Sequence, residues 1–378
     1  MSSILYFDNA ASTKVDPRVL EEMLPYFTET YANPSALHTP AQRAKAAIEE
    51  SRETIAELLG ANDPSEIIFT SGATEGNNTV INIFREGTIL ISAIEHPSVL
   101  NTALETGRCK LIPVDSTGKI DDEVFSRLLE ETKPSLVSVM LVNNEIGTIQ
   151  NIDRLGELTR KAGAYFHTDL TQAVGKMELN LAERPVDYAT LSGHKFHAPK
   201  GIGALYVRSS APFTHFMVGG THENGRRAGT LNAPGIVGLG KAARLVMEEY
   251  PKERERFASM KRRIVKAILE KVPDSRLNGS LDESAPHIIS ISFYRTEGES
   301  IIINLDTKGI CVTAGAACSS GLQKRSHVLT AIGLPEEWLR GTVRLSLGRF
   351  NTEEEAEILI QSLIESVEEV RSLGYVAQ

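Results

Sequence analysis

The sequence predicts an α/β protein built around a largely parallel sheet, and three observations lead to this fold class. Short apolar runs typical of strands alternate with longer segments whose apolar residues recur at helical spacing. The strand candidates are apolar at consecutive positions, as buried strands of parallel sheets are. The length of 378 residues suits one large and one small domain. Such an alternation of strands and helices is typical of the α/β class.

The composition argues against several kinds of partner and location. The chain is 41% apolar and 24% charged, with a formal net charge of −9 and no long basic run, so neither nucleic acid nor a membrane is an expected partner. No apolar run approaches the roughly 20 residues of a spanning helix, and the N-terminus shows no secretory signal. The three cysteines form no Cys-x-x-Cys pair, which argues against disulfides and structural zinc. We therefore expect a cytoplasmic protein.

The first half of the chain supplies the elements of the large domain. Asp16-Pro17 is typical of a helix start, and apolar residues repeat at helical spacing from there to residue 27. Thr39-Pro40 opens a second helix, which is expected to end at Gly60. Another helix is expected over residues 153–162. Strands are predicted over residues 66–70, 88–93, 136–142, 165–169 and 186–191.

The pattern changes after Gly203. A polar, glycine-rich loop at residues 219–230 precedes two expected helices, 232–250 and 252–271. Thr352 is expected to cap a final helix with acidic residues in its first turn. Strands are predicted in this part over residues 287–293, 309–313 and 342–347. We expect a large domain over residues 14–250, with a smaller α+β domain formed by residues 1–13 and 251–378.

Polar residues follow one predicted strand after another. Ser71, His96, Asn144, Asp169 and His194 each fall at the carboxyl end of a strand. Ligands of open α/β sheets bind at this edge, because the connections converge there and helix N-termini point inward. The sequence therefore predicts a binding site along this edge.

Lys195 stands at the end of the apolar run 186–191, among glycines and a proline. A lysine that is desolvated there has a lowered pKa and condenses with a carbonyl group to form a Schiff base. The alternative is an ordinary loop lysine whose ammonium group lies in water. The choice between the two depends on the rest of the chain.

Several stretches, taken together and in order, resemble the cysteine desulfurases. The resemblance implies an α/β fold, the aminotransferase fold type I of enzymes that depend on pyridoxal 5'-phosphate (PLP), class V, with a mostly parallel sheet in the large domain. It covers almost the whole chain. The matching stretches are Tyr6-Phe7-Asp8-Asn9-Ala10-Ala11, Asn33-Pro34-Ser35, Thr70-Ser71-Gly72-Ala73-Thr74-Glu75, Glu95-His96, Asn143-Asn144-Glu145-Ile146-Gly147-Thr148, His167-Thr168-Asp169, Ser192-Gly193-His194-Lys195, Gly225-Arg226-Arg227-Ala228-Gly229-Thr230 and Ala317-Cys318-Ser319-Ser320.

The resemblance implies a role for several residues around PLP. Lys195 would hold the cofactor covalently and later move protons, and His96 would stack on the ring and shuttle protons. Asp169 would pair with the pyridine nitrogen, which makes the ring an electron sink. Gln172 would donate to the phenolic oxygen, and Asn144 would contact the cofactor and the substrate. A solvated glutamine and a turn asparagine are the alternatives for the last two.

The phosphate of PLP would be bound at a helix N-terminus, where the helix dipole favours an anion. The resemblance implies that Thr230 reaches the phosphate of the neighbouring subunit, and hence that the protein is a homodimer. Simple helix capping is the alternative for the stretch from Ser71 to Thr74. The phosphate ligands implied within one chain are Ala73, Thr74, Ser192 and His194.

Cys318 lies in a run of small residues typical of a mobile loop. The resemblance implies that its thiolate attacks the sulfur of bound L-cysteine, whose carboxylate Arg344 would grip, so that a persulfide forms on Cys318 and L-alanine leaves. No resident metal is expected; whether Cys318 also ligates an iron–sulfur cluster transiently stays open. Cys109 and Cys311 lie in apolar stretches and are expected to be buried and inert.

The resemblance implies an iron–sulfur scaffold protein or another sulfur acceptor as the partner. A selenocysteine lyase or a related PLP lyase is the first alternative. A non-catalytic sulfur-relay subunit is the second, and the retention of Lys195, Asp169, His96 and Cys318 argues against it. Two departures from the family pattern are Ala198, where glycine is usual, and a short segment between residues 82 and 88.

Overall fold

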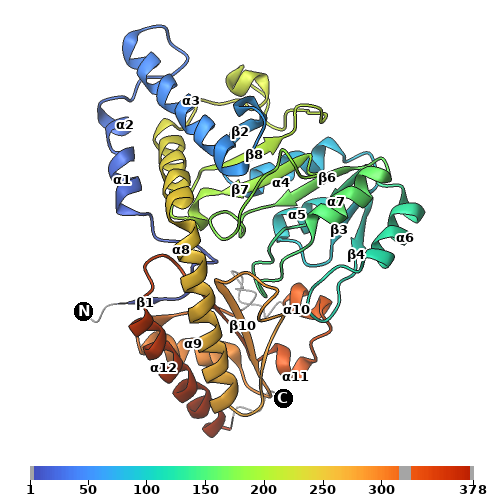
Figure 1. Ribbon diagram of the computed structural model, residues 1–378, viewed down its shortest axis with the longest axis vertical. Helices are drawn as coiled ribbons and strands as arrows, with labels where there is room; N and C mark the ends of the chain where they lie inside the picture. The colour runs from blue at the N-terminus through green and yellow to red at the C-terminus, as the bar shows by residue number, and fades with distance from the viewer. Residues whose placement is uncertain (1–3, 315–324, 375–378) are drawn as a thin grey trace.

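The computed structural model describes residues 4–314 and 325–374. A seven-stranded sheet occupies one end of the molecule and a three-stranded sheet the other, with helix α8 (Ala233–Lys271) running past both (Figure 1). None of the helices in these residues has an apolar stretch long enough to cross a bilayer.

The large sheet is mixed but mostly parallel. Its strand order is β2-β8-β7-β6-β5-β3-β4, and only β8 runs antiparallel to its neighbours, β2 and β7. The strands are β2 (Ile67–Thr70), β3 (Ile89–Ser92), β4 (Cys109–Ile112), β5 (Leu136–Ser138), β6 (Tyr165–Asp169), β7 (Tyr188–Ser192) and β8 (Gly203–Val207). The strand predicted over residues 136–142 ends early, although the N–H groups of Val139 and Leu141 still donate to carbonyl oxygens of β6.

Helices of the first half surround this sheet. The helix predicted from residue 16 to 27 is divided, because Pro25 cannot donate a backbone hydrogen bond. The long helix ends at Gly60 in the left-handed conformation, as predicted, but its N-cap is His38 and not Thr39. The helices are α1 (Pro17–Met23), α2 (Pro25–Thr28), α3 (Thr39–Leu59), α4 (Ala73–Ile83), α5 (Pro97–Glu105), α6 (Asp122–Thr132) and α7 (Ile152–Lys161), with a short 3-10 turn η1 (Pro64–Glu66) before β2.

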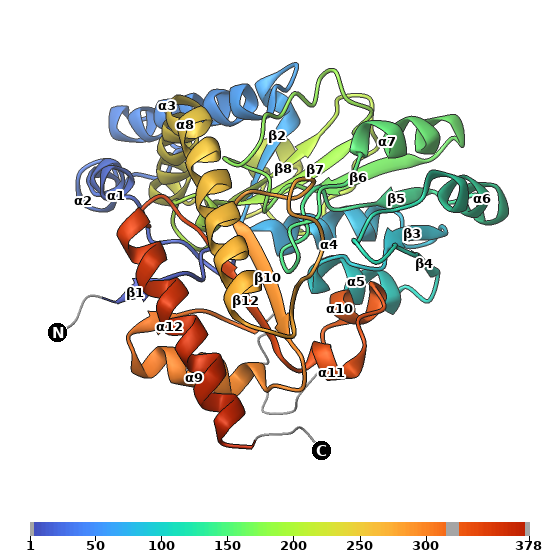
Figure 2. The same cartoon turned by 60° about the horizontal axis from the view of Figure 1, so that its bottom comes forward.

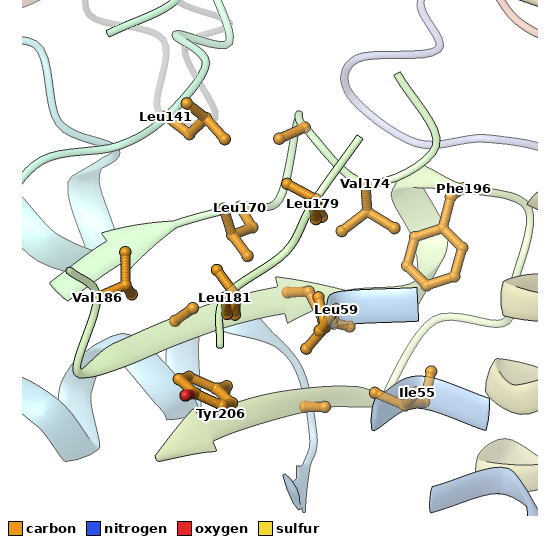
Figure 3. Close-up of a cluster of buried hydrophobic side chains, with 14 of the residues drawn as sticks. Ile55, Leu59, Leu141, Leu170, Val174, Leu179, Leu181, Val186, Phe196 and Tyr206 are labelled. Atoms are coloured by element: carbon orange, nitrogen blue, oxygen red, sulfur yellow. The ribbon is translucent and has the colours of Figure 1, made fainter. Parts of the chain in front are cut away.

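The main core lies between the large sheet and the helices on one of its faces (Figure 3). Ile55 and Leu59 of α3 pack there with Tyr206 of β8 and with Leu170 and Phe196, which come from the segments after β6 and β7. These side chains are nearly or wholly buried. The consecutive apolar residues in each strand are explained by this arrangement, because both faces of the sheet are covered.

The smaller sheet has the order β12-β10-β9 and is antiparallel. The helices α9 and α12 lie to one side of it, and α10 lies beside α5 of the large domain (Figure 2). The predicted cap of α12 is present as a reciprocal capping box between Thr352 and Glu355. The elements are β9 (Ser275–Leu277), β10 (Ile288–Phe293), β12 (Thr342–Ser346), α9 (Gly298–Thr307), α10 (His327–Ala331), α11 (Glu336–Leu339) and α12 (Glu353–Ser372), and β1 (Leu5–Tyr6) pairs in parallel with β11 (Ile310–Cys311).

Helix α8 corrects one prediction. Two helices were expected, broken near residue 251, whereas one helix of 39 residues contains Pro251. The first half, with Leu239, packs in the core of the large sheet, and the second half, with Phe257 and Ile264, packs in the core of the small sheet. Burial on both sides of the proline outweighs its missing hydrogen bond. The division near residue 250 stays a prediction, and the helix itself continues through this position.

Candidate active site

A cavity of about 670 Å³ lies at the carboxyl ends of the large-sheet strands, and the small-sheet domain adds part of its wall. The position agrees with the site expected for an open α/β sheet. All five polar residues predicted at strand ends line it. The lining residues used below are Ser71, Gly72, Ala73, Thr74, His96, Ser98, Asn144, Glu145, Asp169, Gln172, Ser192, His194, Lys195, His327 and Arg344.

Lys195 ends a short 3-10 turn, η2 (Gly193–Lys195), directly after β7. Its Nζ donates to the carbonyl oxygens of Ala10 and Ala11, both at 2.7 Å. Burial lowers the pKa of Lys195 to about 8, and the Arg344 guanidinium acts in the same direction. The amine is therefore within reach of the neutral, nucleophilic form near physiological pH.

Asp169 ends β6 and is almost wholly buried. Its Oδ2 accepts from Asn77 Nδ2 at 2.9 Å, and its Oδ1 accepts from the backbone N–H of Thr171 at 2.9 Å. These bonds hold the carboxylate in one orientation at the cavity wall. Asn77, on the inner face of α4, was not singled out from the sequence, because nothing in its neighbourhood distinguishes it from a helix-surface asparagine.

His96 is the N-cap of α5 and faces the cavity. Its Nδ1 accepts from the backbone N–H of Ser98 at 3.1 Å and lies 2.8 Å from Ser98 Oγ. Burial by the surrounding protein lowers the pKa of His96, with Asp169 opposing and Lys195 and His327 adding to this effect. The imidazole is therefore held neutral near pH 7.

The N-terminus of α4 borders the opposite part of the cavity. Its N-cap, Gly72, has φ of 153°, and a Cβ there would lie 3.3 Å from Ser192 Oγ. Thr74 and Ala73 follow in the first turn, whose backbone N–H groups form a site suited to an anion. The His194 ring completes this wall, and its Nδ1 lies 3.2 Å from Ser12 Oγ.

Gln172 is buried, and both ends of its amide have partners. Its Nε2 donates to the Ala10 carbonyl at 2.9 Å, and its Oε1 lies 3.2 Å from His287 Nε2. Burial holds the pKa of His287 well below its usual range, so the neutral ring donates to Gln172 through Nε2. This contact sets the amide so that its N–H group, and not its oxygen, faces the carbonyl of Ala10, which also accepts from the amine of Lys195.

Arg344 lies in the middle of β12 and reaches into the cavity from the small sheet. Its Nη2 donates to Asp8 Oδ1 at 2.8 Å and its Nη1 to the Asn144 carbonyl at 2.9 Å. Its Nε is buried and has no hydrogen-bond partner in the part of the chain that the structure describes. A buried, unpartnered guanidinium N–H indicates a place for an additional acceptor.

Two residues that the resemblance implied are not placed in this cavity. Thr230 is exposed and does not line it. Its loop is tied to α4 by the ion pair of Arg227 with Glu75, at 2.8 Å. Cys318 lies outside the described residues.

The other cysteines are half-buried, whereas the sequence predicted buried thiols. Burial raises the pKa of Cys109 to about 11 and also raises the pKa of Cys311. Both thiols therefore stay protonated near neutral pH and are poor nucleophiles, in line with the inert character expected from the sequence.

His194 and His197, which sequence spacing alone could suggest as a metal pair, have different partners. His197 turns away from the cavity, with its Nδ1 2.9 Å from the Lys14 carbonyl. Within residues 4–314 and 325–374, no group of three or more histidine, cysteine or acidic side chains is arranged to hold a metal ion. Ala198 has no positive φ, so glycine is not needed there.

The cavity fits PLP on the observations above. An amine of lowered pKa, an oriented carboxylate and a helix N-terminus with a glycine turn lie around one space. These are the groups that an aldehyde, a pyridine nitrogen and a phosphate need. The guanidinium of Arg344, whose Nε has no partner among the described residues, adds a donor for a substrate carboxylate in the same cavity.

Comparison with known proteins identifies relatives along nearly the whole chain. The family model described as aminotransferase class-V matches residues 5–359. A cysteine desulfurase of Nostoc sp. is 44% identical, with 98% of this chain and 95% of that protein aligned. A cysteine desulfurase IscS of Clostridium botulinum is 40% identical, with 99% of this chain and 97% of that protein aligned.

Solved structures agree with these relatives. A NifS-like protein superposes with a TM-score of 0.90 at 35% identity, covering 97% of this chain and 100% of that chain. The structure titled SspA in complex with cysteine gives a TM-score of 0.78 at 35% identity, covering 92% and 100%. From its sequence and its fold alike, the chain belongs to the class-V aminotransferase family and, within it, to the cysteine desulfurases, which are PLP-dependent enzymes.

Proposed function

We propose that this cysteine desulfurase converts L-cysteine to L-alanine and leaves a persulfide on Cys318, from which the sulfur passes to an acceptor. The observation that carries the proposal is the juxtaposition, in one cavity, of the Lys195 amine, the Asp169 carboxylate and the Arg344 guanidinium. Bound PLP supplies an electron sink for the substrate. The residues of the chain supply binding, orientation and proton transfer.

Arg344 is the residue that binds the substrate carboxylate. Asp8 and the Asn144 carbonyl hold its two terminal nitrogens, so the guanidinium plane is oriented before substrate arrives. The carboxylate of the substrate would then supply a hydrogen-bond acceptor for the unpartnered Nε. Orientation in advance lowers the ordering cost of binding.

Lys195 and His96 are the proton carriers. Lys195 holds PLP, and once its amine is free it takes a proton from the substrate carbon or returns one. Its lowered pKa suits both directions near neutral pH. His96 is neutral and carries one N–H, so it can donate a hydrogen bond in the cavity, and its ring exchanges a proton near neutral pH. The further contacts that we propose for the cofactor are Asn144, Gln172, Ser192, His194, Ala73 and Thr74.

We propose Cys318 as the residue that takes the sulfur atom from the substrate. Its thiolate attacks the sulfur of the bound cysteine, an S–S bond forms, and the Cβ–S bond breaks with its electron pair going to Cβ. Protonation of Cβ then gives alanine, so no external oxidant or reductant is required. The proposed acceptor is an iron–sulfur scaffold protein or a thiolation enzyme, in the cytoplasm.

Mass spectrometry tests the proposal. The enzyme is incubated with L-cysteine, and alanine formation is measured beside the intact mass. We expect alanine and an adduct of about 32 Da, one sulfur atom, that maps to Cys318. Cys318→Ala should keep the visible absorbance of bound PLP and lose both products. An adduct on Cys109 or Cys311, or undiminished alanine formation in Cys318→Ala, would overturn the assignment.

A selenocysteine lyase is the second candidate function, and it differs in its need for the thiol. If Cys318→Ala released selenium from selenocysteine at the wild-type rate while losing activity on cysteine, lyase chemistry would be independent of Cys318. Equal loss on both substrates would favour the desulfurase alone.

The proposed homodimer is tested by mixing two variants. Lys195→Ala lacks the amine, and Thr230→Ala lacks the hydroxyl proposed to act in the partner's site. In a mixed dimer, one site has Lys195 from one subunit and Thr230 from the other. We expect about a quarter of wild-type sites after random reassociation. No gain over the separate variants, or a monomer by light scattering, would contradict the shared site.

A further inference from the structure

Three hydrogen bonds connect His96 with Asp169 through Ser98 and Asn77, and a fourth, from Thr190, fixes the amide of Asn77. Asn77 Nδ2 donates to Asp169 Oδ2 and to Ser98 Oγ, both at 2.9 Å. Thr190 Oγ1 donates to Asn77 Oδ1 at 2.6 Å. Ser98 Oγ lies 2.8 Å from His96 Nδ1. The side chains come from α4, β6, β7 and the start of α5, so packing of separate elements creates the connection.

The direction of each bond is determined by the chemistry of its members. Asn77 has no exposed surface, and the hydroxyl hydrogen of Thr190 goes to its Oδ1. The opposite amide orientation would place Oδ1 against the Asp169 carboxylate, where two acceptors repel. Both hydrogens of Nδ2 are therefore directed to Asp169 and Ser98.

The hydroxyl group of Ser98 connects Asn77 with His96 and determines which nitrogen of His96 accepts a hydrogen bond. Its Oγ accepts from Asn77, so its own hydroxyl hydrogen is left to donate to His96 Nδ1. The backbone N–H of Ser98 donates to the same nitrogen at 3.1 Å. A nitrogen that accepts two hydrogen bonds carries no proton, so the neutral ring must carry its proton on Nε2.

We propose that Asn77 is a positioning residue that fixes the proton of His96 on Nε2 and, through its second N–H, orients the Asp169 carboxylate. Asn77 does not line the cavity, whereas His96 and Asp169 do. One amide thus sets the state of both groups that flank the cofactor. The inference deepens the proposed function, because it rests on the roles given there to His96 and Asp169.

Other groups act on the charge of His96 but do not select its tautomer. Asp169 raises its pKa, and Lys195 and His327 lower it. His327 Nε2 is engaged with the Glu95 carbonyl at 2.8 Å and makes no bond to the ring of His96. Among the described residues, the contacts on His96 Nδ1 all come from Ser98. The tautomer therefore reports on the two donors of Ser98, of which the hydroxyl group is the one directed by Asn77.

The test reads the tautomer directly by nitrogen NMR. Full-length enzyme labelled with ¹⁵N in its nine histidines is measured with PLP bound and after its removal, and His96 is assigned from a His96→Gln spectrum. Asn77→Ala and Ser98→Ala are compared with Asn82→Ala. Asn82 is the control because it lies on the same helix and donates only to the Asn78 carbonyl.

We expect wild type and Asn82→Ala to show the proton on Nε2. Ser98→Ala and Asn77→Ala should show a mixture of tautomers, and turnover should fall by up to roughly a hundredfold, the lower end of what a positioned general acid contributes. Asn77→Ala should in addition shift the pH dependence of the PLP absorbance, since Asp169 loses a donor. Ser98→Ala should leave that absorbance unchanged.

Three results would overturn the inference. These are a wild-type proton on Nδ1, an unchanged tautomer in both Asn77→Ala and Ser98→Ala, or the same mixture in Asn82→Ala. If Asn77→Ala does not fold, Ser98→Ala and Thr190→Val take its place, since Thr190→Val frees the amide to turn. The tautomer is read without turnover, so a correct tautomer in an enzyme that does not desulfurate cysteine would refute the proposed function and not the positioning role.

Discussion

At the scale of single residues, the cavity holds groups whose proton equilibria are shifted by their surroundings. Lys195 is held by two backbone carbonyl oxygens near the Arg344 guanidinium, and burial lowers its pKa to about 8. Only the neutral amine attaches PLP. We expect the rate of PLP attachment to the apoprotein to rise with pH through about 8 and then level off, as followed by visible absorbance. A rate that continued to rise up to pH 10 would show an ordinary lysine.

Glu145 shows the opposite shift. Burial raises its pKa to about 7 from an ordinary value of 4.5, although the Ser326 hydroxyl, at 2.5 Å, opposes the effect. Between pH 4.5 and about pH 7, Glu145 thus keeps a proton in the folded protein that it releases in the unfolded chain. The stability that this group contributes is complete below pH 4.5 and is lost as the pH rises through about 7.

Glu145→Gln imitates the protonated side chain and should avoid that loss. We expect the free energy of unfolding of the variant, relative to wild type, to rise by about 2 kcal/mol between pH 5 and pH 8. Urea unfolding at several pH values measures the difference. The exposed Glu157→Gln is the control for removing one negative charge. A constant difference across this range would contradict the prediction.

At the scale of elements, a buried ion pair anchors the glycine-rich loop 219–230. Arg52 of α3 donates to both carboxylate oxygens of Glu223, at 2.8 and 2.7 Å, and Glu223 also accepts from the Phe69 N–H. Glu223 and Asn224 have positive φ of 51° and 56°, so the loop adopts a conformation that needs an anchor. The same loop carries Thr230 toward the surface.

Arg52→Met should be strongly destabilising, because it leaves the Glu223 carboxylate buried without its partner. We expect a loss of about 3 kcal/mol or more in the free energy of unfolding, measured in urea. Arg154→Met is the matched control, since Arg154 and Asp122 form an exposed pair at 2.8 Å whose loss should cost under about 1 kcal/mol. Equal losses of unfolding free energy in the two variants would show that the buried pair of Arg52 and Glu223 stabilises the fold no more than an exposed pair does.

At the scale of the whole molecule, a charge network joins the two sheets. Asp16, which lies before α1, accepts from Arg18 and from Arg349 of the segment after β12, each at 2.8 Å. Arg349 also pairs with Glu249 and Glu253, on the two sides of Pro251 in α8. The network thus links the N-terminal segment, the long helix and the small sheet.

Acid should weaken this junction. The hydrogen bonds from Arg18, and those from Arg349, hold the pKa of Asp16 well below its ordinary value of 3.8. The stability that it contributes is complete above this ordinary value and is lost as the pH falls below it. Asp16→Asn should be less stable than wild type at pH 7 by at least about 2 kcal/mol, and the gap should narrow below about pH 4. Asp122→Asn, in an exposed pair, should show neither effect.

The sequence by itself determined the class of fold, most strands of the parallel sheet and the family. Local rules were sufficient for the left-handed cap at Gly60, the capping box at Thr352 and the strand Tyr165–Asp169, because each depends on neighbours within a few residues. The site edge was also predictable, since the carboxyl ends of parallel strands converge. The motifs that resemble cysteine desulfurases indicated which residues at this edge form the candidate site.

Only the tertiary structure decided how those residues are held. Arg344 with Asp8, Gln172 with His287, and Asn77 with Asp169 are separated by about a hundred residues or more, and no local pattern connects them. The break expected at Pro251 was wrong for the same reason, since burial against two separate cores outweighs a local preference. Spacing in the chain determines local conformation, whereas long-range contacts and proton positions depend on which surfaces pack together.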